Sequence, residues 1–160
     1  MMQQHTRLLP AGLMIWAVVL LTTPTMAQID FGDHASSTLT TKAWEAMGRG
    51  ELDTALTYAN QCISMYEAEA FRMQASLSAF PANDPPETTF AYWALNDVGT
   101  CYFIKGEIFL KKSDTKAALE AFTKCAERFS YSQCWDTRGW FWRPGVSAKQ
   151  KVLELSFDAE

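Results

Sequence analysis

Two stretches of this sequence decide its fold, because they repeat one pattern. They read Gly50-Glu51-Leu52-Asp53-Thr54-Ala55-Leu56-Thr57-Tyr58-Ala59-Asn60-Gln61-Cys62 and Ser113-Asp114-Thr115-Lys116-Ala117-Ala118-Leu119-Glu120-Ala121-Phe122-Thr123-Lys124-Cys125. Ala55 aligns with Ala118, and Cys62 aligns with Cys125. Each copy is typical of a tight turn followed by an amphipathic helix with small residues along its buried stripe. The pattern predicts the second half of a helix-turn-helix repeat unit, an architecture that binds partners more often than it catalyses.

The rest of the chain also favours helices. We expect them over residues 38–47, 51–80, 84–112, 115–129 and 146–157, and the second could be two helices with a bend near Tyr66. Gly99 and Gly106 lie seven residues apart and so share one face of the third helix. Because Gly inside a helix costs ~1 kcal/mol relative to Ala, we expect another helix to cross closely there. The sequence therefore predicts an all-α fold.

Residues 130–145, here called the Trp-rich segment, have a different character. They are rich in aromatic and turn-forming residues and have no helical period. We expect a loop there, followed by a last helix that caps the stack. The chain then divides into a signal peptide (1–27), a flexible lead (28–37), a helical domain (38–129), the Trp-rich loop (130–145) and the capping helix (146–160).

The helical domain resembles the tetratricopeptide repeat family, which pairs two helices that cross at small residues. The residues that match the pattern of its Gly, aromatic, Ala, aromatic and small positions are Gly106, Phe109, Ala118, Phe122 and Cys125. In the first unit the matching residues are Ala43, Ala55, Ala59 and Cys62. The two copies start 63 residues apart, short of two periods of ~34 residues. The resemblance thus implies a short, divergent array of antiparallel helix pairs with a lengthened helix between them.

The Trp-rich segment is also similar to the tail of certain small exported bacterial tetratricopeptide proteins, some of which are labelled beta-glucanase. The match runs from Cys134-Trp135-Asp136 through Gly139-Trp140-Phe141-Trp142-Arg143-Pro144. The family resemblance implies contact with another protein through the concave face of the array, and it implies no reaction.

The first 27 residues predict export. Arg7 precedes a nearly unbroken apolar run from Leu8 to Leu21, and Thr25-Met26-Ala27 offers small residues where a signal peptidase cleaves. We expect cleavage after Ala27 and a location in a periplasm or outside the cell. The alternative is an uncleaved run that keeps the protein on a membrane as a monotopic protein. No later segment is apolar enough to span a bilayer.

Charge and composition limit the functions open to this chain of 160 residues. Its net charge is −4 and becomes −5 once Arg7 is removed. Nucleic-acid-binding domains typically carry an excess of basic residues, which this chain lacks. After cleavage His34 is the one remaining histidine, so most His-based catalytic and metal sites are excluded. The carboxylates that a glycosidase would need are present but follow no motif: Asp97, Glu107, Asp114 and Asp136. We predict no enzyme, no metal and no cofactor.

All four cysteines follow the apolar run, and an even number in an exported chain allows disulfides. Cys101 and Cys125 are nearly equidistant from the turn at Ser113, so a disulfide could join them across a helix pair. Cys101–Cys134 competes with that pairing. The third alternative is that the cysteines are buried free thiols that pack as small apolar groups.

Two groups of residues are candidates for partner binding. A groove between the first helices of the units would be lined by Trp93, Asp97, Tyr102 and Lys105. The Trp-rich segment adds Trp135, Arg138, Trp140, Trp142 and Arg143, since aromatic and Arg clusters dominate interface hot spots. The alternative for these rings is burial as a plug at the end of the stack. Helix packing is expected at Ala55, Gly99, Gly106 and Ala118.

The sequence as a whole predicts an exported, non-enzymatic module that binds a protein or peptide. The alternative is an accessory protein of the cell envelope that binds or acts on carbohydrate through the Trp-rich segment. Self-association could lengthen an array of only two recognisable units.

Overall fold

The computed structural model describes residues 29–83, 86–136 and 138–157. The expected signal peptide lies outside these residues. Within them the chain forms six helices and one two-stranded sheet, which confirms the predicted all-α class. The helices are α1 (Ser36–Gly48), α2 (Leu52–Ala75), α3 (Glu87–Phe90), α4 (Trp93–Lys111), α5 (Thr115–Arg128) and α6 (Pro144–Phe157). None of these helices is both long enough and apolar enough to cross a membrane.

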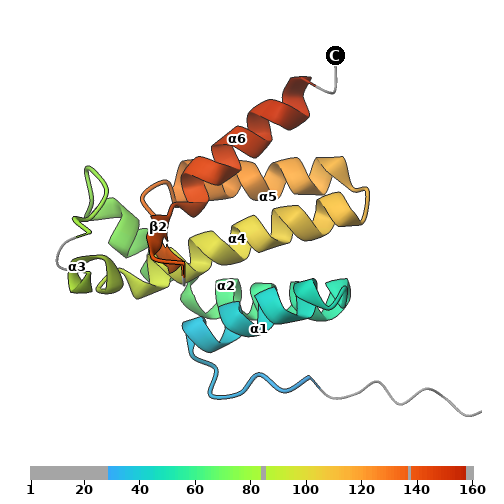
Figure 1. The fold of residues 1–160 in the computed structure, drawn as a ribbon, viewed down its shortest axis with the longest axis horizontal. Helices are drawn as coiled ribbons and strands as arrows, with labels where there is room; N and C mark the ends of the chain where they lie inside the picture. Colours follow the sequence, from blue (N-terminus) through green and yellow to red (C-terminus); the bar gives the residue numbers. More distant parts are fainter. Residues whose placement is uncertain (1–28, 84–85, 137, 158–160) are drawn as a thin grey trace, which may run out of the picture.

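The long helices form a stack in which α4 lies between α1 and α2 on one side and α5 on the other (Figure 1). Helix α6 packs on α5 and diverges from it toward the C-terminus (Figure 1). The core between the helices combines small residues with large apolar ones, among them Leu39, Leu95, Ile104, Phe122 and Phe129, all fully buried. Ala55 and Ala118 are also fully buried, so their small side chains let neighbouring helices approach.

The two glycines of α4 both lie against the chain of α5 and its continuation. A Cβ atom on Gly106 would come within 2.5 Å of the Phe122 ring of α5. A Cβ atom on Gly99 would come within 2.6 Å of Ser132, which follows α5. The expected helix crossing is therefore present at Gly106, whereas Gly99 accommodates the first residues of the Trp-rich segment.

The segment predicted as one helix over residues 84–112 is divided into α3 and α4. Tyr92, between them, has a non-helical backbone (φ −94°, ψ 37°). Side chains near this break form hydrogen bonds with backbone carbonyl groups. Asn96 donates to the Thr89 carbonyl oxygen at 2.9 Å, and Thr89 donates to the Ala82 carbonyl oxygen at 3.1 Å. Such side-chain bonds compete with a continuous helix. Helix α2 is one continuous helix, and it ends earlier than expected, at Ala75.

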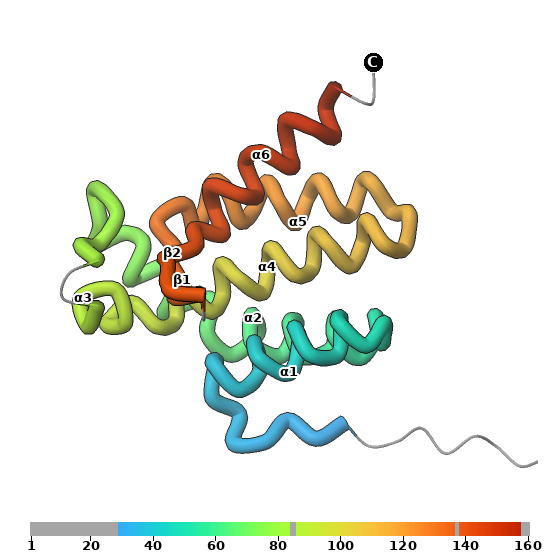
Figure 2. Tube along the Cα trace, in the orientation of Figure 1, coloured from blue at the N-terminus to red at the C-terminus, as the bar shows by residue number. Residues whose placement is uncertain are grey.

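The Trp-rich segment, expected to be a loop, contains an antiparallel hairpin of β1 (Cys134–Asp136) and β2 (Trp140–Trp142). Cys134 pairs with Trp142, and Asp136 pairs with Trp140. Gly139 supplies a turn residue at φ +97°, which Gly tolerates better than other residues. Figure 2 shows the hairpin beside the N-terminal end of α4.

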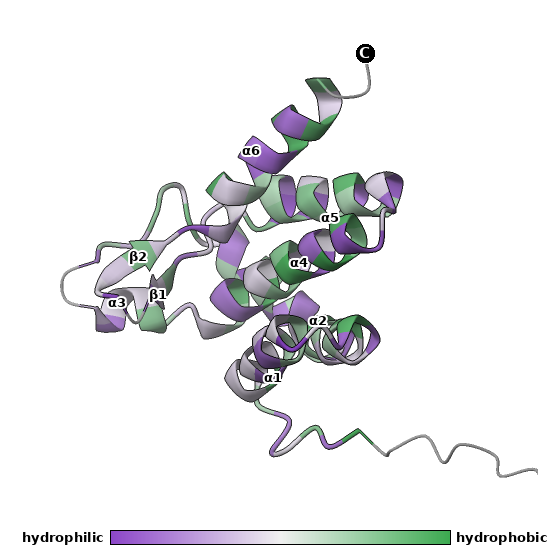
Figure 3. Ribbon diagram, turned by 45° about the vertical axis from the view of Figure 1, so that its right-hand side comes forward, coloured by the Kyte–Doolittle hydropathy of each residue, from purple (hydrophilic) through white to green (hydrophobic). Residues whose placement is uncertain are grey.

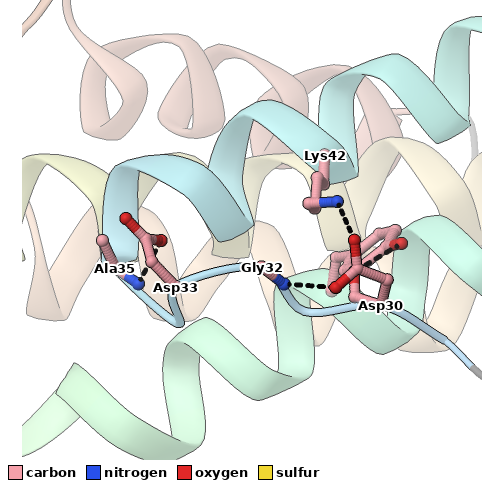
Figure 4. A network of polar contacts seen from close by, with 6 residues as sticks. Asp30, Gly32, Asp33, Ala35 and Lys42 are labelled. Carbon is pink, nitrogen blue, oxygen red and sulfur yellow. Dashed lines mark hydrogen bonds and ion pairs between the residues drawn. The ribbon is translucent and has the colours of Figure 1, made fainter.

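The lead before α1, expected to be flexible, makes specific contacts over residues 29–35. Asp30 accepts hydrogen bonds from the Gly32 backbone and from Lys42 of α1, and Asp33 accepts one from the Ala35 backbone (Figure 4). Tyr58 of α2 donates to the Asp30 carbonyl oxygen at 3.1 Å. These bonds tie the lead to α1 and α2.

Candidate functional site

The hairpin stands against α1 and α4 and encloses a hollow of about 520 Å³ with them, here called the aromatic pocket. Figure 3 shows β1 and β2 standing out beside the helical stack. Three elements line the pocket: Thr40 and Trp44 from α1, Asp97, Thr100 and Phe103 from α4, and Cys134, Trp135, Asp136, Arg138, Trp140 and Trp142 from the hairpin. This volume is in the range of sites that bind small molecules.

The hairpin is held in place by Gln133, a fully buried residue just before β1. Its backbone N–H donates to Asn96 of α4 at 2.9 Å, and its side-chain nitrogen donates to Thr89 at 3.1 Å and to the Pro81 carbonyl oxygen at 3.2 Å. Arg143 donates to the Gln133 side-chain oxygen at 2.8 Å. Because buried polar groups of this kind are costly to leave unpaired, the network fixes the base of the hairpin on α3 and α4.

Trp142 forms the inner wall of the aromatic pocket. Its ring centroid lies 5.1 Å from that of Phe103 and 6.1 Å from that of Trp44, at interplanar angles of 81° and 64°. The indole N–H donates to Ser147 of α6 at 2.8 Å. Trp142 therefore has a structural part in joining the hairpin to α6 as well as a surface on the pocket.

Trp135 and Trp140 form the outer wall and are 50% and 46% exposed. Trp135 packs edge-on against Phe141, with centroids 5.1 Å apart. The Arg138 guanidinium lies 5.6 Å above the Trp140 ring and donates to both oxygens of Asp136, at 3.0 and 3.1 Å. The Trp-rich segment thus combines partial burial with exposure: Trp142 is half-buried, whereas the rings of Trp135 and Trp140 are exposed.

Two carboxylates of opposite character line the pocket. Burial raises the pKa of Asp97 from 3.8 to about 6, although the Ser36 hydroxyl of α1 donates a hydrogen bond to it. Hydrogen bonds from the Arg138 side chain and backbone hold the pKa of Asp136 below its usual value. At neutral pH both groups are ionised, and Asp97 is the one whose protonation changes near pH 6.

The predicted groove residues divide between two faces of α4. Trp93 and Asp97 lie on the hairpin side, where a second hollow of about 280 Å³ adjoins the aromatic pocket and shares Asp97, Cys134 and Trp135 with it. Tyr102 faces α2 and α5 instead: its hydroxyl donates to Glu67 at 2.8 Å, and Lys124 lies 5.0 Å from its ring. Lys105 donates to Asn60 of α2 at 3.0 Å.

Tyr102 and Lys105 therefore do not line the aromatic pocket. A helix turns ~100° per residue, so Tyr102 is directed ~140° away from Asp97 and Lys105 ~80° away. Arg143 also differs from the prediction, because its guanidinium lies 4.0 Å over the Phe80 ring and holds Gln133 rather than lining the aromatic pocket. Trp44 and Phe103 line the pocket but were not among the predicted binding residues. Their helical spacing, which places them on the hairpin side of α1 and α4, is the sequence feature that could have indicated them.

All four cysteines are free thiols, so neither Cys101–Cys125 nor Cys101–Cys134 is formed. Cys101 lies 3.3 Å from the Thr40 hydroxyl, and Cys62 lies 3.8 Å from the same oxygen. Cys125 donates to the Gly99 carbonyl oxygen at 3.1 Å, and Cys134 lies 3.1 Å from the Thr100 hydroxyl. Cys62, Cys101 and Cys125 pack as small groups in the core, the third of the expected alternatives, and the half-buried Cys134 lines the aromatic pocket.

The remaining carboxylates singled out in the sequence have structural partners. Glu107 pairs with Lys151 of α6 at 3.2 Å, and Asp114 caps α5 by accepting from the Ala117 N–H at 3.0 Å. Across the described parts of the chain, no three His, Cys, Asp or Glu side chains gather so as to hold a metal ion.

Comparisons of the chain with protein-family models, with curated proteins and with solved structures give no match.

Proposed function

We propose that this protein is an exported, non-enzymatic binding module of tetratricopeptide type that receives a protein or peptide partner at the aromatic pocket. The observation that carries the proposal is the display of Trp135 and Trp140 on the rim of a hollow between α1, α4 and the hairpin. Exposed Trp rings beside Arg138 have the composition of an interface hot spot. The hairpin base, fixed by Gln133, presents them without a large ordering cost.

The tetratricopeptide assignment is supported by the order of the helices. Helices α1 and α2 pack together, as do α4 and α5, and α6 follows on α5. Small buried residues lie in these helices at Ala55 and Ala118, and Gly106 adjoins Phe122. Export is supported by the apolar run from Leu8 to Leu21 and the cleavage site that ends at Ala27. Intact mass of the native protein tests it, since retention of residues 1–27 would contradict cleavage.

The test of binding is selection from a displayed library of random peptides, followed by a titration of the selected peptides. The variant Trp135→Ala/Trp140→Ala should weaken binding at least tenfold, because both rings are lost from the rim. Phe157→Ala is the matched control, since Phe157 is 75% exposed at the end of α6 and does not line the pocket. Failure to select any peptide, or equal binding by the Trp variant, contradicts the proposal.

A second function, hydrolysis or binding of a glycan, is favoured by one observation. Asp97 and Asp136 line the same aromatic pocket, and their pKa values are shifted in opposite directions. Below pH 6 Asp97 is protonated while Asp136 is ionised, and glycosidases use such a pair of an acid and an ionised partner. Hydrolysis of β-glucan that is lost in both Asp97→Asn and Asp136→Asn would establish this function and overturn the non-enzymatic one.

A further inference from the structure

Asp97 is a largely buried carboxylate that faces the aromatic pocket without a cation beside it. Its hydrogen bond from Ser36, at 2.5 Å, occupies one of its oxygens. None of the ion pairs between described residues includes Asp97. A buried carboxylate normally has a charged or multiply hydrogen-bonded partner. Asp97 therefore retains capacity to accept hydrogen bonds from a group that enters the pocket.

The other charges of the pocket cancel. Arg138 donates to both oxygens of Asp136, at 3.0 and 3.1 Å, so this exposed pair contributes no net charge. The negative charge of Asp97 acts on two thiols, those of Cys101 on its own helix and Cys134 on the hairpin. Burial raises the pKa of both thiols, so they are neutral at pH 7. One negative charge remains, and it complements a ligand with one positive charge.

The walls of the pocket also suit a cation on an apolar stem. Three of the rings that line it meet at steep angles, because Trp142 stands at 81° to Phe103 and at 64° to Trp44. Rings at such angles form a corner that surrounds a narrow chain, whereas a pyranose ring stacks one of its faces on a single exposed aromatic ring. The faces of Trp rings attract ammonium and guanidinium groups, and methylene groups gain by burial against them.

We infer that the aromatic pocket receives a long basic side chain, lysine above all, from the partner polypeptide. The methylene stem lies against Trp135, Trp140 and Trp142, and the ammonium group reaches Asp97 and forms a charge-assisted hydrogen bond. The choice of a polypeptide as the source rests on the proposed function, whereas the positive charge rests on the pocket itself.

The test uses n-butylammonium chloride, which reproduces the lysine side chain, and n-butanol, its neutral analogue. Tryptophan fluorescence of the full protein is titrated with each at a constant ionic strength maintained with sodium chloride. The ammonium compound should saturate the signal at a concentration at least tenfold lower than butanol. Asp97→Asn should abolish this preference. Glu120→Gln should keep it, because it removes an exposed carboxylate of α5 that does not line the pocket.

The inference is overturned by no saturable response, by equal concentrations for ammonium and alcohol, or by a preference that survives in Asp97→Asn. A response to cellobiose without one to butylammonium also overturns it and favours the glycan function. Titration of the selected peptides on the same samples separates the two proposals. If peptides bind but ammonium is not preferred, only the inference of a basic side chain in the pocket is refuted. If ammonium is preferred but no peptide binds, only the proposal of a polypeptide partner is refuted.

Discussion

At the scale of single residues, Asp97 links the stability of the protein to its binding. Its pKa is about 6 in the folded protein and near 3.8 in an unfolded chain, so the folded state holds the proton more tightly. The contribution of Asp97 to stability is therefore most favourable below pH ~4 and declines as the pH rises to ~6. Above that pH the buried charge is a constant cost, which is typical of a group kept for function.

Asp97→Asn should therefore stabilise the free protein at pH 8, by about 1–3 kcal/mol. Asn keeps an oxygen that accepts from Ser36 but carries no charge to bury. The difference should vanish near pH 4, where the wild-type carboxyl is protonated. Urea unfolding at the two pH values measures it, with Glu120→Gln as the control expected within ~0.5 kcal/mol of wild type. A less stable Asn variant at pH 8 would show that the native state compensates the Asp97 charge.

The candidate site was partly predictable from residue types. Clustered Trp and Arg residues indicated Trp135, Arg138, Trp140 and Trp142, all of which line the aromatic pocket together with Asp97. Tyr102 and Lys105 lie outside this pocket, because their angular position on α4 directs them toward α2. The role of Arg143 could not be predicted from its residue type, because that role depends on contacts with Gln133 and Phe80 that form only in the folded chain.

At the scale of elements, the crossing of α4 and α5 depends on the missing side chain of Gly106. Gly106→Ala should lower the free energy of unfolding by about 1–3 kcal/mol, because its Cβ atom would lie 2.5 Å from the Phe122 ring. The higher helix propensity of Ala returns up to ~1 kcal/mol, so the clash outweighs it. Gly48→Ala is the control: nothing lies within 4 Å of its Cβ position, and it should be neutral or slightly stabilising. Thermal unfolding of both variants compares the two sites, and equal stability would refute a tight crossing.

The elements themselves were predictable where the pattern was long and local. Small-residue stripes and the Asp114 cap predicted α2 and α5, and the cap bond to Ala117 is present. The break between α3 and α4 was not predictable, because it depends on the buried bonds of Thr89 and Asn96. The strands of the hairpin have three residues each, too few to show an alternating pattern in the sequence, and the hairpin is anchored to α4 by Gln133, which precedes β1.

At the scale of the whole molecule, the four thiols report on how the helical stack opens. Cys62, Cys101 and Cys125 are fully buried on α2, α4 and α5, so the buried thiols belong to three helices of one core. Burial raises the pKa of Cys101 and Cys125, and it raises that of the half-buried Cys134 to about 12. The thiolate is the reactive form, so exposure and ionisation both require opening.

The native protein at pH 8 should therefore react slowly with a thiol reagent at every cysteine, and all four should become reactive over one denaturant range. Because α4 contacts α1, α2 and α5, the core should open as a unit. Reagent uptake is followed by mass spectrometry without prior reduction, and Cys134→Ser is the control for local opening at the hairpin. Fewer than four reactive thiols in the unfolded protein would reveal a disulfide and contradict the free-thiol structure. Rapid native labelling of one site, lost in Cys134→Ser, would show that the hairpin opens independently of the helices.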